Sequence, residues 1–176
     1  MTDTTSGLVC GHHHLYSALA RGMPAPPVQP TDFRSILEQI WWRLDTALDL
    51  EMLRWSAMLG AVEALQCGTT AIVDHHESPH AIEGSLDVIA EACAEVGVRV
   101  SCAYGITDRH GPDGARRGLA ENERYLASGG RGRASRTRCT IGCAPRARMK
   151  NEARAVPPHA GTEGHEARCP HSTGSA

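Results

Sequence analysis

Three short apolar runs alternate with longer segments of helical spacing, and this alternation limits the possible folds more than any other feature of the sequence. The runs lie near residues 8–12, 69–74 and 98–104. Strands that are separated by helices run parallel, because each connection must cross over the sheet. The order of elements therefore predicts an α/β fold, either a layered sheet or a barrel. In such folds the polar residues that follow each strand form the functional site.

Four helices are expected from apolar residues that recur at steps of three and four. Their ranges are about 33–44, 49–65, 85–96 and 113–127. Thr31 or Asp32 can cap the first helix, because short polar side chains accept hydrogen bonds from the first free backbone N–H groups. Gly68 and Gly97 suit the positions that follow the second and third helices.

Residues 1–130 and 131–176 have unrelated compositions. The first segment contains 9 Arg and 17 acidic residues, whereas the second contains 9 basic and 3 acidic residues, no Leu and no aromatic residue. The second segment has too little apolar surface to offset the cost of ordering its backbone, about 1–2 kcal/mol per residue. We therefore expect residues 131–176 to form an irregular, disordered tail. Such an abrupt change is also typical of a GC-rich gene read out of frame, and we hypothesise a frameshift near codon 130.

Charge and hydropathy exclude several classes of protein. The formal net charge is −2, whereas nucleic-acid-binding proteins usually carry a strong basic excess. No segment reaches the roughly 18–20 apolar residues of a membrane span, and no signal-peptide core follows Met1. We expect a cytoplasmic protein without nucleic-acid or membrane partners. Four cysteines lie among apolar residues and are predicted to be small buried side chains: Cys10, Cys67, Cys93 and Cys102.

The motif His12-x-His14 lies at the C-terminal end of the first expected strand. Side chains at positions i and i+2 of an extended segment project to the same face, so these two imidazoles can converge on one metal ion while His13 points the other way. Imidazole binds zinc and iron alike, so the pair alone does not select the metal. A remnant of a histidine tag or a chance polar loop is the alternative interpretation.

Several motifs, in their order along the chain, resemble those of a known family. Residues 6–15 resemble the first-strand motif of the amidohydrolase superfamily, and residues 68–70 resemble its second-strand signature. Four further segments are similar to the selenium-metabolism-associated aminohydrolases of the cytosine deaminase and chlorohydrolase branch. They are His14–Gly22, Trp41–Asp45, Asp74–His76 and Tyr104–Arg109. The resemblance extends from about residue 6 to about residue 130.

This resemblance implies a (β/α)8 barrel, of which residues 1–130 supply about three strand–helix units. It also implies one divalent metal ion, zinc or iron, with His12 and His14 as its two ligands from the first strand. In this family the metal acidifies a water molecule, which attacks an sp2 ring carbon and displaces an amine. The expected substrate is therefore a small molecule of the amino-heterocycle class.

Other candidate site residues follow from the same resemblance. Ser17 stands where several deaminases of this branch carry a substrate-binding Gln. Asp74, His75 and His76 follow the second strand and can orient substrate or support the metal indirectly. Equally, Asp74 can be a loop cap and the two histidines solvated polar residues. Trp41 and Trp42 are interpreted as packing residues rather than as a platform for a ligand.

The family's remaining metal ligands and its acid/base residue lie on later barrel strands, so no catalytic residue is assigned here. We therefore expect a truncated hydrolase that is inactive alone. The alternative is a non-catalytic metal-binding or interaction fragment. Three parallel strands leave unpaired edges, so the chain is expected to aggregate or to associate, for example as a homo-oligomer.

Overall fold

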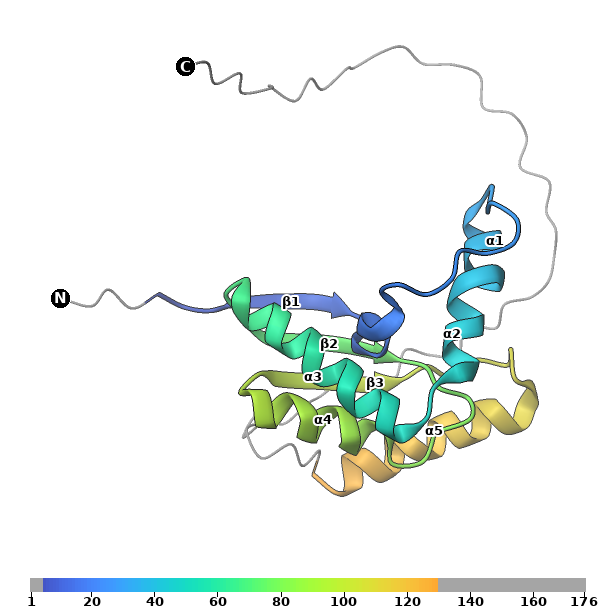
Figure 1. Cartoon of the computed structure of the whole chain (residues 1–176). Coiled ribbons are helices and arrows are strands. Elements are labelled where there is room, and N and C mark those ends of the chain that lie inside the picture. The colour runs from blue at the N-terminus through green and yellow to red at the C-terminus, as the bar shows by residue number, and fades with distance from the viewer. Residues whose placement is uncertain (1–4, 130–176) are drawn as a thin grey trace, which may run out of the picture. The chain divides into compact units, whose positions relative to one another are not determined.

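The computed structural model describes residues 5–129, so the expectations for residues 131–176 lie outside the described residues. Three parallel strands form one sheet in the order β1-β2-β3. They are β1 (Leu8–His13), β2 (Thr69–His76) and β3 (Arg99–Tyr104). The helices are η1 (Leu15–Ala20), α1 (Phe33–Ile36), η2 (Leu37–Trp41), α2 (Trp42–Ala47), α3 (Leu50–Gln66), α4 (Ser85–Val96) and α5 (Gly111–Ala127). The predicted α/β alternation is confirmed (Figure 1).

Capping residues define the helices much as the sequence predicts. Asp32 caps α1 by accepting a hydrogen bond from the Ser35 N–H, and Asp49 caps α3 in the same way. Gly97 ends α4 in the left-handed conformation, with φ of 99°. The first predicted helix is one continuous segment from α1 to α2, but its middle, η2, is a π-helix. The short helix η1 was not predicted.

The two faces of the sheet differ in burial. Ile72, Asp74 and His76 of β2 are buried, and they alternate with Val73 and His75, which are exposed. The buried side faces the core, to which α3 and α4 contribute (Figure 1). On β1, Val9 is 68% exposed on the open side. The sheet thus has one covered face and one face that the described residues leave open.

Strand β2 is two residues longer than predicted. Its pairing with β3 continues through His75 opposite Ala103 and His76 opposite Tyr104. The ladder therefore includes both histidines, which the sequence pattern placed after the strand. Because side chains alternate along a strand, His75 and His76 point to opposite faces.

The prediction of four buried cysteines is only partly right. Cys93 and Cys102 are buried, and Cys10 is half-buried. For Cys67 the prediction is wrong, because this residue is exposed. It ends α3 and precedes Gly68, whose φ of 78° turns the chain toward β2 at the surface. Among the described residues, no helix combines the length and apolar character needed to cross a membrane.

Candidate metal centre

The two histidines of the H-x-H motif lie together at the C-terminal end of β1, with His12 inside the strand and His14 directly after it. The Nε2 atoms of His12 and His14 are 3.1 Å apart. The ring of His13 lies on the other side, where its Nδ1 is 4.0 Å from Asp74 Oδ1. The predicted alternation of the three imidazoles is therefore present in the structure, and two of them converge on one point in space.

A hydrogen bond from the neighbouring strand orients the ring of His14. Its Nδ1 lies 2.9 Å from the carbonyl oxygen of His75. Because a carbonyl oxygen can only accept, Nδ1 carries the proton and Nε2 presents a lone pair. Metal-binding histidines are commonly held in this way through their second nitrogen. The ring of His14 is thus held with the lone pair of Nε2 facing His12 Nε2.

The separation of the two Nε2 atoms fits a shared metal ion. Two nitrogens, each about 2.0–2.1 Å from a tetrahedral zinc ion, lie about 3.3 Å apart. The observed 3.1 Å is close to this value, and it is also the length of an ordinary hydrogen bond between the two ring nitrogens. However, no group of three or more His, Cys, Asp or Glu side chains within residues 5–129 is arranged to hold a metal ion. Within the described residues, the two imidazoles thus converge without a third candidate ligand beside them.

Asp74 points away from the two converging imidazoles and supports the backbone behind them. Its Oδ1 accepts a hydrogen bond of 2.6 Å from the Leu15 N–H, the residue that follows His14. Its Oδ2 has no hydrogen-bond partner within the described residues. Burial raises the pKa of this carboxyl group to about 7. This contact caps the turn that follows β1, and the same turn carries His14.

The other candidate residues from the sequence, His75, His76 and Ser17, occupy three different environments. His75 is on the open face, and its ring centroid lies 5.5 Å from that of His14. His76 is completely buried on the opposite face, with Nε2 2.7 Å from Ser78 Oγ, so it is not a solvated residue. Ser17 donates a hydrogen bond to the His14 carbonyl oxygen, which uses its hydroxyl in the turn after β1.

Two aromatic rings lie beside His14. The ring centroids of Tyr16 and Trp41 are 5.7 Å and 5.6 Å from that of His14. Trp41 also packs on the small core formed by Tyr16, Leu48 and Leu53. The packing role predicted for this tryptophan therefore holds, and the same ring borders the candidate ligand.

Sequence reasoning missed a charged cluster at the same end of the sheet. One guanidinium nitrogen of Arg109 lies 2.8 Å from Asp45 Oδ2 and 2.8 Å from Glu77 Oε2. The guanidinium also lies over the Trp42 ring, 4.9 Å from its centroid. Burial raises the pKa of Asp45 to about 6 and that of Glu77 to about 7, although Arg109 opposes both shifts. Trp42, Asp45 and Arg109 lie in the resembling motifs, but their contacts with one another are not visible in the sequence.

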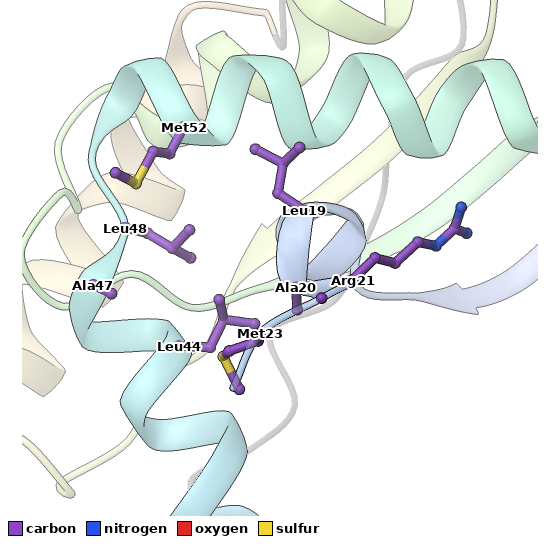
Figure 2. A pocket seen from close by; sticks show the side chains of 9 residues that line it. Leu19, Ala20, Arg21, Met23, Leu44, Ala47, Leu48 and Met52 are labelled. Carbon is purple, nitrogen blue, oxygen red and sulfur yellow. The ribbon is translucent and has the colours of Figure 1, made fainter. Parts of the chain in front are cut away.

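The pocket drawn in Figure 2 is separate from the histidines. It has a volume of about 310 Å³ and lies between η1 and the corner that joins α2 to α3. Its wall is mainly apolar, with Leu44, Leu48 and Met52 on one side. The Arg21 side chain extends away from the pocket and pairs with Glu63. Since His12 and His14 are not among its lining residues, this pocket is not the candidate metal centre.

The amidohydrolase family matches residues 4–153 of this sequence. The chain belongs to the amidohydrolase family. This amidohydrolase match confirms the resemblance inferred from the ordered motifs. It also extends beyond residue 130, where the sequence motifs end.

Curated relatives of this amidohydrolase chain are named as deaminases. It is 34% identical over 122 residues to the 5′-deoxyadenosine deaminase of Methanopyrus kandleri, covering 67% of this chain and 25% of that protein. It is 32% identical over 113 residues to 5-methylthioadenosine/S-adenosylhomocysteine deaminase 2 of Archaeoglobus fulgidus, covering 64% of this chain and 24% of that protein. It is 31% identical over 133 residues to the 8-oxoguanine deaminase of Pseudomonas aeruginosa, covering 69% of this chain and 29% of that protein. The chain thus spans about a quarter of the length of these relatives.

Burial of His76 leads to a prediction on acid stability. Burial lowers the pKa of His76 to about 3, whereas its value in the unfolded chain is near 6.5. The unfolded chain therefore binds this proton first, and the contribution of His76 to stability should fall as the pH drops from about 6.5 toward 3. The variant His76→Gln keeps a polar group but cannot gain that charge. Its free energy of unfolding, measured by urea unfolding followed by circular dichroism, should fall less over this pH range. The exposed His80, changed to Gln, serves as the control, and equal pH slopes in all three proteins would contradict the prediction.

Proposed function

We propose that His12 and His14 are two ligands of a divalent metal ion, zinc or iron, in a hydrolase that acts on the carbon–nitrogen bond of a small amino-heterocycle. The observation that carries this proposal is the 3.1 Å separation of the two Nε2 atoms, together with the hydrogen bond from His14 Nδ1 to the His75 carbonyl oxygen. The deaminase names of the relatives support the substrate class.

The residues of the chain contribute binding and orientation to this chemistry. A bound divalent ion would lower the pKa of a water molecule, which is the chemistry that such an ion supplies. The His75 carbonyl oxygen keeps the proton of His14 on Nδ1, so that Nε2 stays available. The rings of Trp41 and the buried Tyr16 pack beside the His14 ring and help to hold it in place.

We further propose that this chain by itself forms an incomplete site. Catalytic and structural zinc sites usually use at least three protein ligands, and the described residues bring two together. The chain should therefore bind a divalent ion weakly and release no ammonia from amino-heterocycles. A non-catalytic metal-binding fragment is the second candidate function, and the same pair of ligands favours it.

Cobalt(II) is a suitable probe for this site, because it replaces zinc and absorbs visible light. Titration of the full chain should give one bound ion, with absorption that EDTA removes. Ammonia release should be undetectable with 8-oxoguanine and 5′-deoxyadenosine as substrates. Absence of cobalt binding would overturn the metal site, and metal-dependent release of ammonia would overturn the incomplete-site proposal.

A further inference from the structure

We infer that Asp74 and Ser56 are positioning residues for His14, because together they fix both peptide groups of Leu15, the residue that follows it. This inference rests on the proposed metal site and adds two residues to its support. Asp74 comes from β2 and Ser56 from α3, so the two side chains approach the same backbone from different elements.

Hydrogen bonds hold Leu15 on both sides. Its N–H donates to Asp74 Oδ1 at 2.6 Å. Its carbonyl oxygen accepts from Ser56 Oγ at 2.7 Å, and the same Oγ accepts from the Leu19 N–H at 3.3 Å. Asp74 is 1% exposed and Ser56 is 0% exposed, so neither bond competes with bulk water. The backbone at this point is therefore fixed by two buried side chains.

The hydrogen bonds that join Asp74 and Ser56 to Leu15, called the clamp below, act on His14 because of where that residue lies. Strand β1 ends at His13, so the β-ladder does not hold His14. The carbonyl group of His14 and the N–H of Leu15 belong to one planar peptide unit. Fixing that N–H through Asp74 fixes the orientation of the backbone that carries the His14 ring. The carbonyl of His75 then orients the ring itself, so β2 supplies both contacts.

The cost of this arrangement indicates a positioning role for Asp74. Burying a carboxyl group costs free energy when one of its oxygens lacks a hydrogen-bond partner. Asp74 Oδ2 has no such partner within the described residues. Ser56 likewise lies on the buried face of α3 among apolar residues such as Leu53 and Ala57. Apolar residues at both positions would avoid this cost, but they would leave the Leu15 N–H and carbonyl groups unpaired.

Variants of the full chain test the clamp through cobalt(II) affinity. Asp74→Leu and Ser56→Ala should each weaken cobalt binding by about 10–100-fold and change the visible absorption, as losses of such supporting contacts do at metal sites. Asp74→Asn keeps an acceptor oxygen and should restore affinity to within a few-fold of the original chain. Val98→Ala removes buried volume at the opposite end of the sheet and should lower stability without changing cobalt affinity.

A second measurement does not depend on metal. Long-range 15N NMR of the histidine rings should show His14 with its proton on Nδ1 in the original chain, and a mixture of tautomers in Ser56→Ala and Asp74→Leu. If the original chain binds no cobalt, the proposed metal site fails, while the tautomer measurement still decides the clamp. Unchanged tautomers, or unchanged cobalt affinity in folded Ser56→Ala, would overturn the clamp.

Discussion

Replacing Arg109 by methionine is expected to lower the free energy of unfolding by about 3 kcal/mol, because it leaves two carboxylates without their cation in a buried site. The side chains of Asp45 and Glu77 are only 2% and 11% exposed. Both lie 2.8 Å from the guanidinium, which also covers the Trp42 ring. Methionine keeps much of the apolar contact and removes the charge. Urea unfolding followed by circular dichroism measures the difference.

The loss of stability in Arg109→Met should depend on pH. Burial already raises the pKa of Asp45 and Glu77, and removal of the cation would raise both further. A carboxyl group with a raised pKa stabilises the folded state while it holds its proton, so the variant should lose stability as the pH rises from about 5 to 8. Arg117→Met is the matched control, because its pair with Glu83 is exposed and should contribute less than about 1 kcal/mol. Equal losses in the two variants would contradict the buried-cluster argument.

Removal of either converging imidazole is expected to abolish most metal binding. His12→Ala and His14→Ala should each weaken cobalt(II) binding by more than about 100-fold, since the loss of a supporting contact alone costs up to about that much. His13 lies on the other face beside Asp74 and is the matched control. Isothermal titration calorimetry with cobalt(II) compares the three variants.

The result for His13→Ala decides whether the strand geometry matters. If all three alanine variants lose binding equally, a flexible histidine cluster binds the metal, and the argument from alternating side chains is wrong. If only the His13 variant loses binding, the metal lies on the helix side with Asp74. Circular dichroism of each variant separates loss of a ligand from loss of the fold.

Features that depend on local spacing could be predicted from the sequence. The parallel strands follow from the helices between them, and the caps Asp32 and Gly97 follow from the chemistry of single residues. The opposite directions of His12 and His13 follow from the period of an extended chain. Each of these predictions needs only neighbouring residues, so tertiary contacts had little opportunity to overturn them.

Features that depend on contacts between distant residues could not be predicted. Strand β2 includes His76 because β3 pairs with it to its end, and this pairing leaves no local signal. Ser56 looks like an ordinary polar residue in an apolar helix until its contact with Leu15 is known. Arg109 and Asp45 are 64 residues apart, and their meeting depends on how α2 packs beside the segment that joins β3 to α5.

The order of the strands in the sheet is also the order in which a ribosome makes them. Each strand pairs with the one synthesised just before it, so the sheet grows at one edge only. Asp74 and His75, which hold the turn after β1, are present as soon as β2 has emerged. A nascent chain can thus bring the imidazoles of His12 and His14 together early, before β3 has emerged. Any metal-binding residue that is synthesised later would then join His12 and His14 after these two are already in place.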